Sequence, residues 1–176
     1  MMMTKKRKLL FYSFIGIQVL VLFFITFTHY ATEWYGEEIR LKTEPIDPRD
    51  LFYGDYVTLR YDINNVSTND VEVNVPLDDS YNYRPVYVVI EKKDYGKVVS
   101  IHNNKPNVAK HHAVLKARMQ YWGKGSRGNN IHLEYGFERY YADSETALEL
   151  EKDYGKFDVI IKVSPWGQKI SRLDYK

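Results

Sequence analysis

The chain has 176 residues, with 25 Lys and Arg against 23 Asp and Glu, sixteen tyrosines and no cysteine. This length accommodates one domain and an anchor, and the lack of cysteine excludes disulfides and a lipid anchor on a cysteine. Four of the cations lie in residues 5–8, so the rest of the chain carries 21 cations against 23 anions. A slightly acidic net charge disfavours nucleic-acid binding, which needs a net basic face, so we expect no nucleic-acid partner; a local basic patch stays open.

Residues 9–28 form an uncharged run, LLFYSFIGIQVLVLFFITFT. Twenty helical residues span about 30 Å, the thickness of the hydrocarbon core of a bilayer. A buried core helix would keep a polar face, which this run lacks. A cleaved signal peptide is the alternative, but its apolar region is shorter, about 7–15 residues, and ends at a pair of small residues that residues 28–32 do not provide. We therefore predict an uncleaved transmembrane helix over residues 9–30, embedded in the lipid bilayer.

The charges on either side of this run predict its orientation. Residues 1–8 contain the basic cluster, whereas Glu33, Glu37 and Glu38 follow the run. Positively charged flanks stay in the cytoplasm. We therefore expect a cytoplasmic tail over residues 1–8 and an extracytoplasmic domain over residues 31–176, held at the cell membrane by a single span.

After residue 36 the apolar residues alternate with polar ones, which indicates half-buried strands. The positions that share one face in each segment are Val57, Leu59, Tyr61 and Ile63; Val86, Val88 and Ile90; Ala113, Leu115, Ala117, Met119 and Tyr121; Ile131, Leu133, Tyr135 and Phe137; and Phe157, Val159, Ile161 and Val163. Residues 94–96 and 165–168 have turn composition. The pattern predicts a mainly β domain, an antiparallel β-sandwich or open β-barrel.

Two further segments interrupt the alternation. Residues 143–155 predict one short helix, capped by Asp143 or Ser144 and followed by Gly155. Residues 64–83 are rich in Asn, Asp, Ser and Thr, and we expect a surface excursion there with a short strand in the sequence DVEV.

Residues 54–61 have the sequence GDYVTLRY, which fits G-D-Y-x-x-L-x-Y, and residues 135–141 have the sequence YGFERYY. The first segment resembles the GDYXXLXY family, membrane-anchored bacterial proteins named after this motif, and the second resembles the family's G-[IF]-E-R-[YF] segment. The resemblance covers roughly residues 36–63 and 84–164. It implies a membrane anchor and an exported β-domain, with a polytopic membrane protein as a candidate partner, and it implies no particular reaction.

Charged and aromatic residues gather in and around these two segments. Glu138 could pair with Arg49, and Arg139 with a carboxylate of the first segment, as buried ion pairs that fix geometry. Such a cluster could equally form a ligand or partner site, and both interpretations stay open. The candidate binding residues are Asp47, Arg49, Asp50, Asp55, Tyr56, Tyr61, Glu138, Arg139 and Tyr140.

Enzymatic and metal chemistry find little support in the sequence. A strand containing G-D-x-V after an anchor also occurs in type I signal peptidases, but these need a serine nucleophile just after the anchor. Here no serine lies between Ser13, inside the apolar run, and Ser67. His112 and His132 could meet across neighbouring strands, although a zinc site usually has three or four ligands. We predict no catalytic residue, no metal and no cofactor.

Three classes of function remain. The favoured one is a non-enzymatic interaction module that binds a membrane or envelope protein. The second is an envelope hydrolase that uses carboxylates such as Asp55 and Glu138. The third is a module that binds a small ligand or a cell-wall glycan through its tyrosines.

Overall fold

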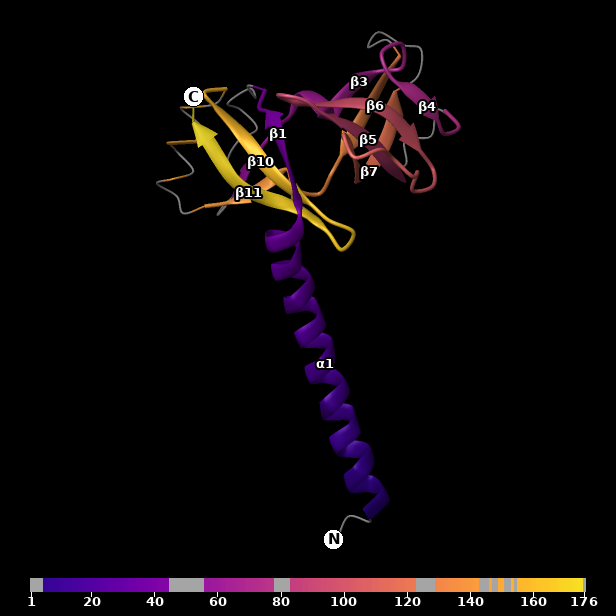
Figure 1. Cartoon of the computed structure of the whole chain (residues 1–176), viewed down its shortest axis with the longest axis vertical. Coiled ribbons are helices and arrows are strands. Elements are labelled where there is room, and N and C mark those ends of the chain that lie inside the picture. Colours follow the sequence, from indigo (N-terminus) through magenta and orange to yellow (C-terminus); the bar gives the residue numbers. More distant parts are fainter. Residues whose placement is uncertain are drawn as a thin grey trace.

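The computed structural model describes residues 5–44, 56–77, 83–122, 129–142, 146, 149–150, 153 and 155–175. A single long helix leads into a domain built from strands (Figure 1). The prediction of a mainly β domain after an N-terminal apolar helix is therefore confirmed.

The helix α1 (Lys5–Tyr35) has 31 residues, which corresponds to about 46 Å at 1.5 Å per residue. The large apolar side chains of residues 9–27 are exposed around it. Within the described residues, α1 is the one helix long and apolar enough to cross a membrane. A helix that is apolar all round and unburied is unfavourable in water, so its surface is compatible with lipid.

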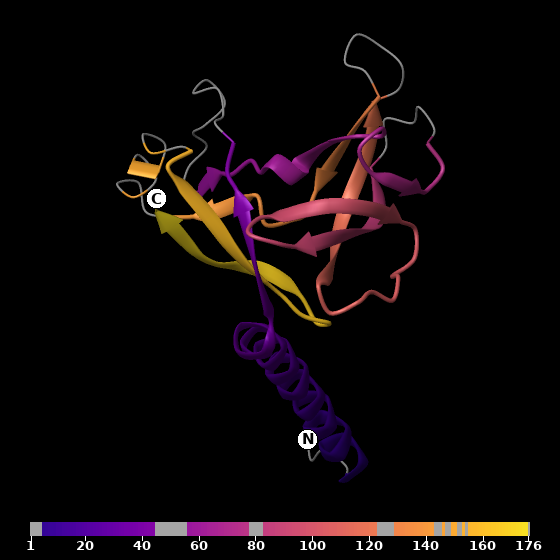
Figure 2. The ribbon, with the colours of Figure 1, turned by 45° about the horizontal axis from the view of Figure 1, so that its top comes forward.

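In the described part of the chain the strands form three sheets. The first contains β1 (Glu37–Lys42), β10 (Phe157–Val163) and β11 (Gln168–Tyr175), in the order β1–β10–β11. The second pairs β2 (Tyr56–Thr58) with β9 (Arg139–Tyr141). The third, in spatial order, contains β3 (Asn65–Ser67), β8 (Asn130–Glu134), β7 (His112–Trp122), β5 (Arg84–Lys92), β6 (Gly96–His102) and β4 (Glu72–Asn74). Figure 2 shows this third sheet strongly curled beside the first, as in an open barrel.

The predicted alternation gives the core. Most of the positions expected to share an inward face are buried, and the largest fully buried side chains include Tyr61, Phe157, Leu41, Leu59, Ile90, Ile101, Leu115, Ile131 and Leu133. The exception is β10, which is buried on both faces because Asp158 and Ile160 are also inaccessible. It lies between β1 and β11 in its sheet. Asp158 accepts a hydrogen bond from the Tyr95 hydroxyl at 3.0 Å, so this buried carboxylate has a polar partner.

The strand expected over residues 56–63 is shorter than the alternation suggested. The strand β2 ends at Thr58, Tyr61 forms an isolated bridge with Thr43, and the 3₁₀ helix η2 (Asp62–Asn64) follows. The inward positions are nevertheless correct, because Val57, Leu59, Tyr61 and Ile63 are all buried. Residues 59–64 pass from the sheet of β2 to the sheet of β3, so their apolar side chains stay buried although their backbone leaves the hydrogen-bonded ladder.

The expectation of an antiparallel sheet fails for one pair of strands. The strand β4, which lies in the predicted DVEV sequence, pairs with β6 in parallel. The other strand pairs are antiparallel. The chain reverses once between β4 and β5, so these two strands run in opposite directions. The strand β6 lies between them in the sheet and is antiparallel to β5, so it is parallel to β4.

Most of the predicted helix over residues 143–155 lies outside the described residues. Thr146, Glu149 and Leu150 are helical, and Leu150 is fully buried. The amide of Asp153 donates to the carbonyl of Glu149 at 3.0 Å. Gly155 has φ +83°, the left-handed conformation expected of the residue that follows a helix.

The last turn of α1 is part of the domain. Thr32 is buried, and its carbonyl accepts the Gly36 amide at 3.0 Å where the chain passes into β1. The Glu33 carboxylate lies 2.9 Å from the ammonium groups of both Lys162 on β10 and Lys169 on β11. Hydrogen bonds from Lys169 and Lys162 lower the pKa of Glu33 to about 2, so this carboxylate stays ionised at neutral pH. Side-chain contacts therefore attach the helix to the β10–β11 hairpin, in addition to the chain connection.

The burial of the Leu59 side chain, 1% exposed, gives a first prediction. Leu59→Asp places a charge in the core and should cost about 4 kcal/mol or more, enough to abolish the cooperative melt. Tyr56→Ala removes a half-exposed ring and should lower the melting temperature by a few degrees, in line with about 1 kcal/mol. Thermal unfolding followed by circular dichroism measures both. Equal losses for the two variants would contradict the assignment of Leu59 to the core and Tyr56 to the outer face.

Candidate functional site

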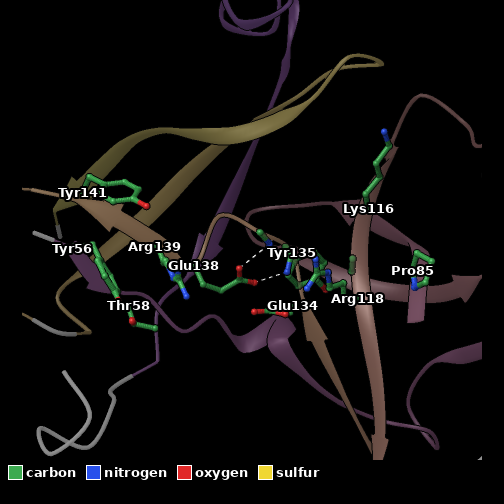
Figure 3. A pocket seen from close by; sticks show the side chains of 12 residues that line it. Tyr56, Thr58, Pro85, Lys116, Arg118, Glu134, Tyr135, Glu138, Arg139 and Tyr141 are labelled. Atoms are coloured by element: carbon green, nitrogen blue, oxygen red, sulfur yellow. Dashed lines mark hydrogen bonds between the residues drawn. The ribbon is translucent and has the colours of Figure 1, made fainter. Parts of the chain in front are cut away.

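A cleft of about 750 Å³ opens between the β2–β9 ribbon, the middle of β7, the start of β5 and the end of β8 (Figure 3). This volume lies within the range of ligand sites in proteins. Its polar and aromatic lining includes Tyr56, Lys116, Arg118, Glu134, Arg139 and Tyr141.

Glu138 organises the floor of the cleft. Its carboxylate accepts hydrogen bonds from the backbone amides of Tyr135 and Gly136 and, at 3.3 Å, from the Asn64 side-chain amide. The dashed lines in Figure 3 mark the two backbone contacts. Gly136 has φ +85°, a conformation that other residues adopt with strain. Glu138 thus closes a tight turn between β8 and β9, and its oxygens are occupied by the protein itself.

Neutral hydrogen bonds join this turn to the chain segment that follows β2. The Leu59 amide donates to the Glu138 carbonyl at 2.6 Å, and the buried Tyr61 hydroxyl donates to the Phe137 carbonyl at 3.1 Å. In return, the Tyr135 hydroxyl donates to the Ile63 carbonyl at 2.9 Å. Burial raises the pKa of Tyr135 well above its usual range, so this hydroxyl keeps its proton.

Asn64 completes the connection. Its side-chain oxygen accepts the Tyr61 amide, and its side-chain nitrogen donates to the Leu133 carbonyl, both at 2.7 Å. Asn64 itself is buried, 2% exposed. In the described residues, hydrogen bonds among backbone, phenol and amide groups therefore join the two family-like segments. The link expected from the sequence was a set of ion pairs, which stays a prediction because its partners, Asp47, Arg49, Asp50 and Asp55, lie outside the described residues.

One wall of the cleft is an exposed cluster of two tyrosines and an arginine. Tyr56 on β2 stands opposite Tyr141 on β9, and their ring centroids are 6.0 Å apart at 61°. The guanidinium of Arg139 lies over the Tyr56 ring, 5.2 Å from its centroid. Such a cation–π contact orients the guanidinium and leaves its edge available. Figure 3 shows the three side chains on the same side of the cleft.

Two cations of β7 form the opposite wall. Lys116 and Arg118 are exposed, and Arg118 stands directly across from Glu134 on β8. In the described part of the chain, Lys116, Arg118 and Arg139 form no salt bridge. With Glu138 committed to backbone amides, Glu134 is the remaining described carboxylate of the cleft, and the lining is positively charged.

Gln168 holds this wall in place. The strand β8 ends at Glu134, so the edge of β7 beside Lys116 has no strand partner on that side. The Gln168 side chain fills this position, because it accepts the Lys116 amide at 2.8 Å and donates to the Lys116 carbonyl at 2.7 Å. It also donates to the Tyr135 carbonyl at 2.7 Å. One side chain thus connects β7, the Glu138 turn and the first residue of β11.

The structure separates the predicted site residues into three groups. Tyr56, Glu138 and Arg139 line the cleft. Tyr61 is buried below it, and Tyr140 packs against the core on the other side of β9. The sequence interpretation missed Tyr141, although its shared parity with the exposed Arg139 was a usable signal. It also missed Lys116 and Arg118, whose proximity to β9 depends on how the sheets assemble.

The two histidines considered as metal ligands lie apart in the register. His112 stands opposite Glu91, and His132 stands opposite Gln120, so they do not face each other across the ladder. His132 instead contacts the Asn65 side-chain oxygen at 2.9 Å. Among the described residues, no group of three or more His, Asp or Glu could hold a metal ion.

The family model for the GDYXXLXY protein matches residues 18–173, and the chain belongs to this family. The match confirms the resemblance drawn from residues 36–63 and 84–164, and it also includes the polar excursion between them. No curated protein and no solved structure matches the chain.

The hydrogen bonds of Glu138 and the exposure of Arg139 predict losses of stability of different size when each residue is replaced by alanine. Glu138→Ala leaves two backbone amides of the turn without acceptors and should cost about 1–3 kcal/mol in the free energy of unfolding. Arg139→Ala removes an exposed cation–π contact and should cost about 1 kcal/mol or less. Denaturant unfolding of both variants measures the difference. A cost for Arg139→Ala as large as that for Glu138→Ala would instead indicate a buried ion pair of Arg139 with one of the predicted acidic partners.

Proposed function

We propose that this protein is a single-pass membrane-anchored interaction module without catalytic activity, which uses its cleft to bind an acidic segment of a membrane or envelope protein. The observation that carries the proposal is the pair of facing walls. The cations of β7 stand on one side, and the Tyr56–Arg139–Tyr141 cluster stands on the other.

The chemistry of these walls favours an acidic peptide. Exposed Arg and Tyr side chains are common at protein interfaces, because they combine apolar contact area with directional hydrogen bonds. Arg139 and Arg118 can each bind a carboxylate with two parallel hydrogen bonds. Tyr141, 72% exposed, offers a ring against which an apolar neighbour of that carboxylate could pack.

The two alternatives differ from this proposal in what they require of the same residues. A hydrolase would need a carboxylate free to act as acid or base, whereas Glu138 is engaged by the Tyr135 and Gly136 amides. A glycan-binding module would use the tyrosine rings as stacking platforms and would not depend on the cations.

The attachment of α1 supports a partner in the same membrane. The Glu33–Lys162 and Glu33–Lys169 contacts hold the domain directly on the end of the helix. A cleft held at a fixed height meets a membrane-embedded partner with less loss of orientational freedom than a cleft on a flexible linker. We further propose that the domain lies outside the cytoplasm, because the cations of residues 5–8 precede the apolar helix.

Topology is tested by reporter fusions after residue 176. Alkaline phosphatase, which is active outside the cytoplasm, should be active there, and a green fluorescent protein that folds only inside should be dark. Replacing the four cations of residues 5–8 with glutamine should lower phosphatase activity, since these charges fix the orientation. An inactive phosphatase fusion together with a fluorescent green fluorescent protein fusion would contradict the orientation, and it would not bear on the chemistry of the cleft.

The partner is tested by photo-crosslinking in intact membranes of the source cells. Benzoylphenylalanine replaces Tyr141 at the cleft or, as the matched control, Tyr175, which is 57% exposed and does not line the cleft. We expect a discrete adduct with a membrane or envelope protein from position 141 and none from position 175.

Charge reversal then tests the acidic segment. Arg118→Glu together with Arg139→Glu should lower the yield of that adduct about tenfold, which requires a loss of only about 1.4 kcal/mol of binding free energy. The control pair, Lys93→Glu and Lys97→Glu, reverses two exposed cations outside the cleft and should leave the yield unchanged. An unchanged yield with the first pair would refute the acidic segment, and an adduct with glycan polymer would favour the glycan alternative.

A further inference from the structure

The turn of the β10–β11 hairpin lies beside the end of α1 at a defined height. The Thr32 hydroxyl is 2.8 Å from the Ser164 hydroxyl, and the Lys169 ammonium is 3.3 Å from the His29 ring nitrogen. In Figures 1 and 2 the hairpin turn lies beside the end of the helix, on the side of the domain from which the helix leaves. The Ser164 contact places the turn, residues 164–167, level with Thr32 near the end of the helix.

That height can be compared with the bilayer. The apolar run ends at Thr28, and residues 29–32 extend about 2–6 Å beyond it at 1.5 Å per residue. The headgroup layer on each side of a hydrocarbon core of about 30 Å is about 5–7 Å thick. A helix tilt of about 20° shortens heights along the helix axis by less than a tenth, and it raises or lowers the turn beside the axis according to the direction of the tilt. If α1 spans the bilayer, the hairpin turn therefore lies in the headgroup layer.

The residue at the tip of this turn suits that layer. Trp166 is 51% exposed, and its amide donates to the Ser164 hydroxyl at 3.2 Å within the turn. On the helix, Tyr30 and Trp34 are 53% and 72% exposed, with ring centroids 6.0 Å apart. Tryptophan and tyrosine concentrate at membrane–water interfaces, where an apolar ring and a polar edge are both solvated favourably.

We propose that the β10–β11 turn is a second membrane contact, in which Trp166 enters the lipid headgroup layer beside Tyr30 and Trp34. The inference rests on the membrane-spanning role of α1 in the proposed function. Two separated points of contact, the helix and the turn, would fix both the height and the rotation of the β-domain on the bilayer. The occupant of this surface is phospholipid, because the turn lies against the end of the helix that enters the bilayer.

The ion pairs near the turn fit a location close to lipid. Glu33 pairs with both Lys162 and Lys169 at 2.9 Å, and Glu38 lies 3.9 Å from Lys162 as a second anion. The Ser171 hydroxyl donates to the Glu33 carboxylate at 3.2 Å. Charges that are paired with one another lose less on approaching a medium of low dielectric than isolated charges do. The exposed Lys105 lies beside Ser164 and Pro165, where its ammonium can reach lipid phosphates.

Tryptophan fluorescence of the full chain in phosphatidylcholine vesicles tests the proposal. The chain has three tryptophans, so Trp34→Phe with Trp122→Phe leaves Trp166 as the only reporter. Two matched chains lack all three and carry instead Leu20→Trp, inside the apolar run, or Tyr141→Trp, at the cleft. Lipids brominated near the glycerol end or near the methyl end of the acyl chains act as shallow and deep quenchers.

We expect Trp166 emission to be shifted to the blue of the Tyr141→Trp reporter and to be quenched more by the shallow lipid than by the deep one. The Leu20→Trp reporter should be quenched most by the deep lipid. Quenching of Leu20→Trp without any quenching of Trp166 would overturn this inference and leave the anchor intact. No quenching of either reporter would overturn both the anchor and the membrane contact.

A second measurement covers the case in which the tryptophan replacements lose the cooperative unfolding of the parent chain. Because the chain has no cysteine, Trp166→Cys and Tyr141→Cys can each carry a single nitroxide label. In the membrane, the ratio of relaxation by oxygen to relaxation by a water-soluble nickel chelate should be higher for the label at position 166 than for the label at position 141. Equal ratios at the two positions would refute the contact.

Discussion

Two crossing segments of chain, joined by buried hydrogen bonds, determine how the sheets of this domain meet. Residues 59–64 lead from β2 to β3, and residues 135–138 lead from β8 to β9. Because β2 pairs with β9 and β3 pairs with β8, both segments pass between the same two sheets side by side. The Tyr61 and Tyr135 hydroxyls each donate to a carbonyl of the opposite segment, and the Asn64 amide donates to the Leu133 carbonyl at the end of β8. An unmade bond at this depth would leave a buried polar group unsatisfied, so the sequence and the crossing are tightly matched.

The cleft is a consequence of this crossing. The β2–β9 ribbon turns away from the six-stranded sheet where residues 135–138 leave β8, and the cleft lies in the angle between them. Glu138 stabilises the tight turn at its floor, with Gly136 in the conformation that the turn requires. The part of the family motif that is described, from Tyr56 to Tyr61, therefore has two roles. Its inward residues hold the crossing, and its outward tyrosine forms part of a cleft wall.

The sequence predicted those features that depend on local alternation and composition. The buried positions of β5, β7 and β8 follow from the period of two. The apolar helix follows from the uncharged run of residues 9–28, and the turns at residues 94–96 and 165–168 follow from turn composition. The end of β2 at Thr58 and the parallel pairing of β4 depend on which strands meet in space, so no local pattern encodes them.

The choice of partners at the site was also beyond sequence reasoning. Glu138 accepts the backbone amides of the turn that directly precedes it in the chain. These partners are its sequence neighbours, Tyr135 and Gly136, whereas the sequence suggested a distant cation. Lys116 and Arg118 occupy outward positions of β7, as Val114 and Gln120 do, and no local pattern indicates which of these positions faces β9. Their place in the cleft depends on Gln168, which bonds to an edge of β7 left open by the end of β8.

Gln168 also connects the membrane side of the domain to the cleft. It follows the turn of residues 164–167 directly, and its side chain bonds to Lys116 in one wall and to the Tyr135 carbonyl at the floor. Only one residue, Gly167, therefore separates Trp166, at the proposed lipid contact, from the side chain that braces the cleft. In a domain with a flexible tether the orientation of a binding site is averaged over many positions, and each binding event must restrict it. Here the helix end, the hairpin turn and the cleft wall form one continuous set of hydrogen-bonded contacts, so the membrane itself would determine the direction in which the cleft opens.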